Sequence, residues 1–274
     1  MDSARGEEFA RLVGVPEDEI DLARAALVIA TANYPQLDVD RQLGLLDALA
    51  AGGRPLLGGE RDPLFCANTL SQYLFDELGF RGNQEDYYDP RNSFLNEVLS
   101  RRLGIPITLS LLYIEVGKRL DVPLVGVGMP GHFLVRHREV ADLFVDPFSG
   151  GILLSVEECA ERLRQAAGRP VPWDPAHLAP LGHRDFIARM LRNLKAIYVQ
   201  PEDYHRALDI VDLLVTLLPG SPEERRDRGL IHYLLGHYPE ALVDLKDYVA
   251  SAPANPDLKA VQALVSRLKG LVGL

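Results

Sequence analysis

His132 and Asp146 are the two residues of this chain whose types and spacing best suit chemistry. They stand 14 positions apart, with short apolar runs between them that are typical of strands. A carboxylate beside an imidazole orients the ring, which then takes a proton from a nucleophile. That nucleophile, often a thiol, is best placed at a helix start, where the helix dipole lowers its pKa. The residues therefore predict two members of a three-residue active site.

The expected thiol is missing from the segment that carries these residues. The helix upstream of them begins at Pro106, with Thr108 and Ser110 shortly after it. A hydroxyl on either residue is an alternative nucleophile, provided that the histidine activates it. Cys66 and Cys159 stand in helical contexts outside the motif and are expected to be ordinary reduced thiols.

The elements that must position this site are mainly helices. Apolar residues at helical spacing and terminal signals predict helices over residues 18–31, 39–51, 63–80, 94–103 and 106–120. Pro106 suits the first turn of the last helix, where a missing N–H costs no hydrogen bond.

The polar stretch 82–93 is predicted to be a loop in front of the fourth helix. Asn92 or Ser93 is expected to cap that helix. Asn92 and Asn96, with nearby arginines, are expected to surround the entrance of the site as a cap and a solvated face. The arginines concerned are Arg91, Arg101 and Arg102.

The hydrophobic period changes after residue 122, and this change sets the predicted fold class. Short runs over 123–129, 133–136 and 143–145 indicate strands, and their short connections indicate antiparallel neighbours. Helices followed by strands predict an α+β fold. A further helix is expected over 156–167, and the proline-rich stretch 168–185 is the best linker candidate.

The C-terminal part of the chain repeats itself. The Tyr-x-x-Ala-Leu pattern at Tyr204 recurs at Tyr238, 34 residues later. Two prolines follow the same interval, with Pro219 and Pro222 matched by Pro253 and Pro256. This is the tetratricopeptide period, in which helix pairs share an apolar face. Two repeats are fewer than a free-standing array needs, so they are expected to pack on the preceding domain or on a second copy. A partner-binding groove and a helical cap for the core both remain open.

Composition excludes several classes of function. The formal charge of −10 argues against a nucleic-acid surface, which needs concentrated Lys and Arg. The acidic N-terminus and the lack of a long apolar run favour a cytoplasmic protein without a membrane span. The remaining histidines show no metal-ligand spacing, and the glycines near residue 128 do not follow a phosphate-loop pattern, so neither a metal nor a cofactor is expected.

Four long motifs resemble the bacterial SirB family of transglutaminase-like proteins. They are EDYYDPRNSFLNEVL from residue 85, RRLGIPITLSLLY from 101, PGHFLVR from 130 and VDPFSGG from 145. The resemblance implies a transglutaminase-like core of the cysteine-proteinase type, with a helical N-terminal segment over 1–60, the core over 61–170 and tetratricopeptide helices over 183–274. It also implies that Pro106 stands where related enzymes carry their cysteine.

These observations favour a non-catalytic protein that binds a protein or peptide partner through a vestigial cleft and the repeats, with regulation as one such role. His132 and Asp146 are then a retained dyad, and the expected binding residues are Asn92, Asn96, Pro106 and Thr108. The alternative is an amidase, peptidase or acyl transferase with a non-cysteine nucleophile. A third hypothesis is a structural scaffold, and a homo-oligomer remains open.

Overall fold

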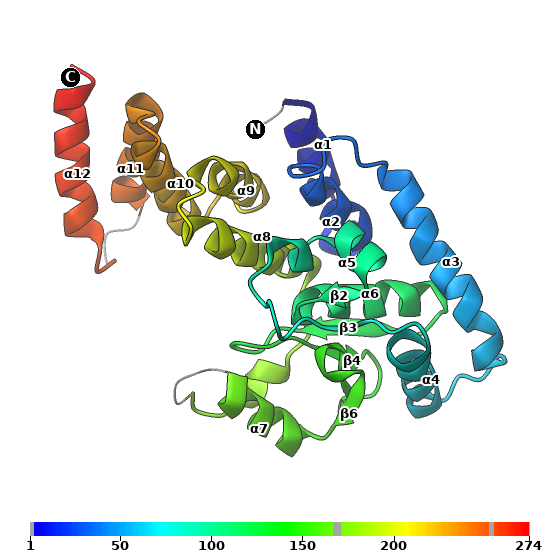
Figure 1. Cartoon of the computed structure of the whole chain (residues 1–274). Coiled ribbons are helices and arrows are strands. Elements are labelled where there is room, and N and C mark those ends of the chain that lie inside the picture. Colours follow the sequence, from blue (N-terminus) through cyan, green and yellow to red (C-terminus); the bar gives the residue numbers. More distant parts are fainter. Residues whose placement is uncertain (1–2, 167–170, 252–254, 274) are drawn as a thin grey trace. The chain divides into compact units, whose positions relative to one another are not determined.

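Helix α6 (Pro106–Arg119) is the buried centre of the larger part of the protein. Every residue from Pro106 to Gly117 is buried, so this helix has no solvent-facing stripe. A helix that is covered on all sides belongs to the interior of a domain. In Figure 1 it runs alongside strand β3 (Leu124–Val127), which it contacts.

The computed structural model describes residues 3–166, 171–251 and 255–273. It divides into two compact units, one formed by Val15–Met190 and the other by Met1–Gly14 with Leu191–Leu274. Helix α8 (His183–Val199) contains the residue at which the chain passes from the first unit into the second.

Three α-helices and a π-helix form the N-terminal part of the first unit. They are α2 (Leu22–Ala30), α3 (Val39–Leu57), α4 (Pro63–Ser71) and the π-helix η2 (Gln72–Glu77). Each α-helix begins at an aspartate whose side chain accepts a backbone N–H of the first turn, as in a capped helix. The predicted helix over 39–51 therefore exists but ends later.

The predicted end of this helix at residue 51 was wrong. The helix continues to Leu57 and ends at Gly58 in the left-handed conformation. A Cβ on Gly53 would lie 3.2 Å from the ring of Tyr73, so a small residue is needed there for close packing. The glycines after Ala51 therefore serve close packing and do not end the helix.

The sheet of this unit has four antiparallel strands in the order β3-β4-β5-β6. Strands β4 (Leu134–His137), β5 (Phe144–Asp146) and β6 (Ile152–Leu154) follow β3 in chain order. The three predicted strands and their antiparallel pairing are confirmed; β3 is shorter than predicted, and β4 and β5 are each shifted by one residue. Strand β6 and a parallel pair, β1 (Arg81–Gly82) with β2 (Leu103–Gly104), were not predicted.

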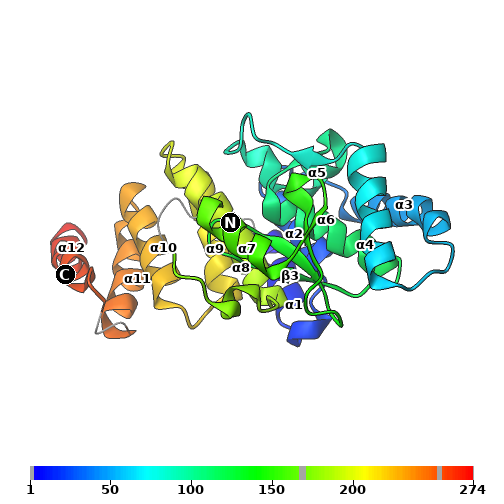
Figure 2. The same ribbon diagram turned by 90° about the horizontal axis from the view of Figure 1, so that it is seen from below.

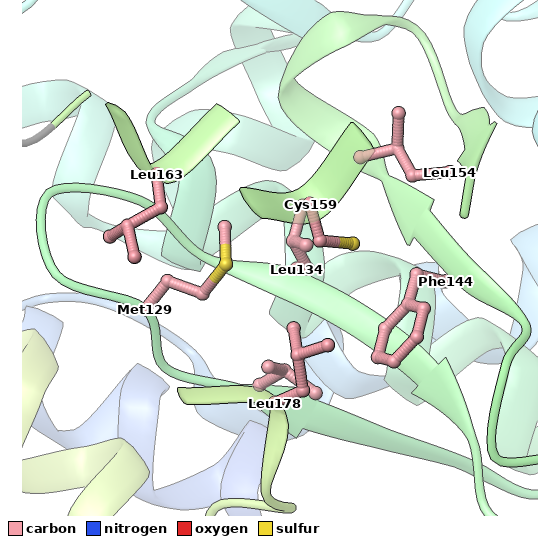
Figure 3. Close-up of a cluster of buried hydrophobic side chains, with 8 residues drawn as sticks. Met129, Leu134, Phe144, Leu154, Cys159, Leu163 and Leu178 are labelled. Carbon is pink, nitrogen blue, oxygen red and sulfur yellow. The ribbon is translucent and has the colours of Figure 1, made fainter. Parts of the chain in front are cut away.

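A small apolar core lies under helix α7 (Val156–Ala166). Figure 3 shows the sulfur of Cys159 among the side chains of Leu134, Phe144 and Leu178. The short helix η5 (Pro175–Leu178) brings Leu178 to this cluster, so part of the predicted linker is ordered core structure. The expected end of α7 at residue 167 and the start of the linker lie outside the described residues.

Two short elements connect the loop after β1 to the centre of the unit. The 3-10 helix η3 (Pro90–Ser93) is followed by α5 (Leu95–Arg101), which corresponds to the helix expected over 94–103. A second 3-10 helix, η4 (Pro147–Ser149), follows Asp146 directly and contacts both α6 and β1. The end of the sheet is thereby brought to the start of α6.

The second unit contains the repeats. Helices α9 (Tyr204–Leu217) and α11 (Tyr238–Ser251) start 34 residues apart, as the tetratricopeptide period requires. Helices α10 (Pro222–Leu234) and α12 (Leu258–Leu271) complete the pairs, and Figure 2 shows α10, α11 and α12 in succession. The expected match at Pro253 lies outside the described residues.

The repeats gain a neighbour from the start of the chain. Helix α1 (Ser3–Val13), which was not predicted, contacts α9 within the same unit. Phe9 on α1 is fully buried, and Arg5 pairs with Asp209 at 3.3 Å. Since two helix pairs alone expose much of their apolar surface, an added helix reduces the part left uncovered.

The glycine pair after η4 provides a matched test of this packing. Gly150 and Gly151 both have positive φ, at 76° and 73°. A Cβ on Gly151 would lie 2.5 Å from Ser71 Oγ and from the ring of Phe75, whereas a Cβ on Gly150 would meet nothing. Gly151→Ala should therefore cost about 3 kcal/mol and Gly150→Ala about 1 kcal/mol of unfolding free energy, measured by urea denaturation. Equal losses would contradict the close packing of Gly151.

Candidate functional site

The structure brings His132 and Asp146 into direct contact. His132 Nε2 lies 2.9 Å from Asp146 Oδ2, within hydrogen-bond distance. Asp146 ends β5, and His132 lies in the turn before β4, so the antiparallel pairing of these strands sets the contact. His132 is 6% exposed and Asp146 is fully buried. This is the geometry in which a carboxylate orients an imidazole.

The carboxylate of Asp146 receives further donors. The Oγ of Ser149 donates to Oδ2 at 2.9 Å, and the backbone N–H groups of Phe148 and Ser149 donate to Oδ1 at 3.1 and 3.2 Å. The guanidinium Nε of Arg162 on α7 lies 3.3 Å from Oδ2. Burial alone would raise the pKa of Asp146, but these donors and His132 outweigh it and lower the pKa below its usual value.

The turn that carries His132 is held by a second arginine. Arg189 Nη2 donates to the backbone oxygens of Met129 and His132, at 2.5 and 2.7 Å. Its guanidinium carbon lies 5.4 Å from the ring centroid of Phe133, in cation-π geometry. Among the described residues Arg189 forms no ion pair with a carboxylate. Its role toward the dyad is therefore to fix the backbone that presents His132.

One imidazole nitrogen of His132 remains available. Nδ1 has no hydrogen-bond partner among the described residues, and it is not one of the fully buried unpaired side-chain atoms. The rings of Tyr87 and Phe148 lie edge-on to each other, with centroids 6.0 Å apart, and Phe148 lies 6.2 Å from His132. A half-buried aromatic pair therefore adjoins the imidazole of His132 through the ring of Phe148.

The three residues considered at the start of α6 are all buried. Pro106 is buried in the first helical position. The hydroxyl of Thr108 donates to the backbone oxygen of Asn92 at 2.7 Å and accepts the N–H of Ile105 at 3.1 Å. The hydroxyl of Ser110 is fully buried and has no partner in the described structure. Thr108 thus closes the helix start, and Ser110 is enclosed by the core.

The prediction for Asn92 and Asn96 was wrong in its physical detail. Residue Phe94, which provides no side-chain cap, precedes α5, and Asn92 and Asn96 are buried rather than solvated. The Asn92 side chain accepts from Asn83 at 3.1 Å and donates to the backbone oxygen of Asp86 at 2.7 Å. It organises the loop after β1, since that loop has few regular backbone hydrogen bonds of its own.

The nearby arginines also serve this loop. Arg91 and Arg101 both pair with the buried carboxylate of Asp89, at 2.8 and 3.4 Å. Arg102 donates to the backbone oxygen of Leu78 at 2.6 Å. Two of the three arginines therefore pair with a carboxylate and the third with a backbone oxygen. The expectation that they form only a solvated face was incomplete.

Neither cysteine replaces the missing thiol. Cys159 lies close enough to Asp146 for an electrostatic interaction with its carboxylate, but it is fully buried in the apolar cluster of Figure 3. Burial, followed by the charge of Asp146, raises the pKa of its thiol to about 12. Burial also raises the pKa of Cys66, which donates to the backbone oxygen of Glu60. Thiols of this kind stay protonated and unreactive.

Comparison with known proteins identifies the families to which the two parts of this chain are similar. A family model described as the transglutaminase-like superfamily matches residues 41–192, which is more than half of the chain. This chain belongs to the transglutaminase-like superfamily. A tetratricopeptide repeat model matches residues 194–266, so the transglutaminase-like domain is followed by repeat helices. No solved structure matches the chain.

The relatives extend over most of the chain. A UPF0162 protein of Xylella fastidiosa (strain Temecula1) is 42% identical over 261 residues, which cover 92% of this chain and 91% of that protein. A UPF0162 protein of Vibrio cholerae is 30% identical, with 92% and 93% covered. Human F-box only protein 21 is 30% identical over 185 residues, which cover 63% of this chain and only 28% of that protein.

Several residues of the site were not identified from the sequence. The backbone contact of Ser149 could have been expected, because an aspartate in a turn often accepts backbone N–H groups that follow it. Arg162 and Arg189 had no local signal, since they reach the dyad from helices 16 and 57 residues away from Asp146 and His132. The described residues contain no group of three or more His, Cys, Asp or Glu side chains suited to a metal ion.

The hydroxyls of Thr108 and Ser110 should contribute differently to stability. Thr108→Val removes a hydroxyl that satisfies two backbone groups and should cost about 2 kcal/mol of unfolding free energy. Ser110→Ala removes a buried hydroxyl without a described partner and should be neutral or slightly stabilising. Urea denaturation of both variants tests the assignment. A loss in Ser110→Ala as large as in Thr108→Val would contradict it.

The carboxylate of Asp146 should contribute to stability in a defined pH range. Because its pKa is lowered on folding, the contribution is complete above the ordinary aspartate value of 3.8 and disappears as pH falls through the lowered pKa. Asp146→Asn should therefore be less stable than wild type by about 3 kcal/mol at neutral pH, and the gap should close in acid. Unfolding measured against pH tests this.

Exposed Asp142, which makes no described contact, supplies the control for that series. Asp142→Asn should follow wild type across the whole pH range. A gap between Asp146→Asn and wild type that stays constant down to the most acidic sample would disprove the assignment.

Proposed function

We propose that this protein is non-catalytic and binds a protein or peptide partner. The binding surfaces are the region around His132, Tyr87 and Phe148 and the tetratricopeptide helices. The observation that carries the proposal is the start of α6, where Pro106 occupies the first helical position and the Thr108 hydroxyl is taken up by the backbone. A proline offers no nucleophile, and a hydroxyl bound in this way would have to break two hydrogen bonds to act as one.

The dyad then has a binding role. His132 Nδ1 is unpaired among the described residues, and Tyr87 and Phe148 present half-buried aromatic surface beside it. Aromatic side chains next to a few directed polar groups are typical of recognition sites. The retained hydrogen bond to Asp146 keeps the imidazole in one orientation, which a ligand needs as much as a reaction does.

The repeat helices support the same role. Tetratricopeptide arrays stack helix pairs into surfaces that bind other chains. Two large apolar side chains of this region, Leu234 and Val243, are 54% and 61% exposed. A regulatory role in the cytoplasm and membership of the narrower SirB family fit this proposal, on the strength of the motifs alone. No helix in the described part of the chain is long and apolar enough to cross a membrane.

Capture of partners with the full chain tests the proposal. Val243→Asp places a charge on the exposed repeat surface and should reduce recovery of a specific partner about tenfold relative to wild type. Leu64→Asp is the matched control, because Leu64 is 51% exposed on α4 of the other unit and should leave recovery unchanged. Quantitative mass spectrometry of cross-linked extracts provides the measurement.

The outcomes separate the hypotheses. Equal recovery by all three proteins would leave the repeats as a structural cap. A hydrolase or transferase activity on glutamine-containing peptides that is present in wild type and lost in both His132→Ala and Asp146→Ala would overturn the non-catalytic assignment.

A further inference from the structure

A cavity of about 480 Å³ lies beside the second half of α6, away from the helix start. Neither His132 nor Asp146 lines it. Its aliphatic walls come from Leu22, Ile114, Val122 and Leu124. This volume is in the range of small-molecule sites, which combine apolar walls with a few polar groups.

Glu115 is the buried charge of this cavity. Its side chain is only 3% exposed, and its Oε2 lies 2.6 Å from Arg119 Nη1. Its Oε1 accepts no hydrogen bond from any described residue. That atom is also not among the fully buried unpaired atoms, so it keeps some accessible surface, and Glu115 lines the cavity. A buried carboxylate oxygen without a donor favours a ligand that supplies one.

Arg119 does not fully neutralise Glu115. Its Nε donates to Asp47 Oδ1 at 2.7 Å, so a single guanidinium serves two carboxylates. Asp47 is 69% exposed and is solvated by water, whereas Glu115 is not. The group of Glu115, Arg119 and Asp47 therefore carries a net negative charge whose buried end faces the cavity.

The other polar groups of the cavity are less selective. Asp18, Lys118 and Arg138 are exposed and form no ion pair within the described structure, and charges of both signs in water contribute little. His183 Nδ1 lies 3.0 Å from the backbone oxygen of Ile20, which leaves Nε2 as an acceptor in the neutral ring. The two inner groups, Glu115 and His183, thus both offer acceptors.

We propose that this cavity binds a primary aliphatic amine, with the ammonium group on Glu115 Oε1 and the alkyl chain along Leu22, Ile114 and Leu124. A guanidinium is less suitable, because its planar pair of donors needs both carboxylate oxygens and Arg119 already occupies Oε2. An ammonium is a compact point charge that one free oxygen can hold. The amine is either a small free molecule or the side chain of a lysine in a peptide.

Methyl NMR of the full chain locates the ligand directly. n-Pentylamine represents the free amine, Nα-acetyl-lysine N-methylamide represents the lysine side chain, and n-pentanol is the uncharged control. At least one amine should shift the methyl signals of Leu22, Ile114, Val122 and Leu124 saturably, and the tighter of the two identifies the source. The absence of a saturable shift with either amine, or an equal affinity for pentanol, would overturn the proposal.

Three variants test the charge. Glu115→Gln should weaken amine binding about tenfold, equivalent to the loss of one charge-assisted hydrogen bond. Asp47→Asn should weaken it about threefold, because Arg119 is then left to Glu115 alone. Asp47 is exposed, so this variant remains informative if Glu115→Gln does not fold. Glu85→Gln makes the same charge change at an exposed residue without a described contact and should have no effect.

Lys118 is a possible internal competitor for Glu115, and the same titration tests it. If its own ammonium folded into the cavity and occupied Glu115, Lys118→Gln would tighten amine binding strongly, and the cavity would be closed by the chain itself. Unchanged binding in this variant supports an external amine, whereas a strong gain would overturn it.

Discussion

The buried carboxylate of Asp146 is the constraint on which the sheet end of the transglutaminase-like unit depends. A charge removed from water is tolerated only when several donors surround it. Here the donors come from the turn before β4, from η4 and from α7, so a single carboxylate connects three elements that are separate in the chain. The same donors would be required in a protein that performs no reaction. The contact between His132 and Asp146 therefore has a structural reason that is independent of any reaction.

The first position of α6 can hold a reactive residue or a residue with a purely structural role. A cysteine at the first helical position uses the helix dipole to become reactive. A proline there cannot react, but it suits the backbone angle and needs no hydrogen bond. Thr108 then ties the helix start to η3 through the backbone of Asn92. Pro106 begins the central helix, which contacts α2, α3, α5 and strands β1 to β4.

The repeat unit compensates for its small size with charge pairs between helices. Arg228 of α10 pairs with Asp244 of α11 at 2.7 Å. Arg226 of α10 pairs with Asp257, the residue before α12, at 2.5 Å, and Asp257 also accepts the hydroxyl of Tyr248. A Cβ on Gly229 would lie 2.8 Å from Leu245, so α10 and α11 approach closely at that point. Close packing and partly buried ion pairs together hold helices that a longer array would hold by stacking alone.

Local patterns in the sequence determined helices α2 to α7, three of the four strands of the main sheet, the 34-residue repeat and the pair His132 and Asp146. These features depend on periodicity, on terminal residues and on a motif within one short segment. Only the tertiary structure decided the roles of Arg162 and Arg189, the burial of Asn92 and the partnership of α1 with α9. The physical reason is that long side chains and buried polar groups choose partners by distance in space, for which sequence separation carries no signal.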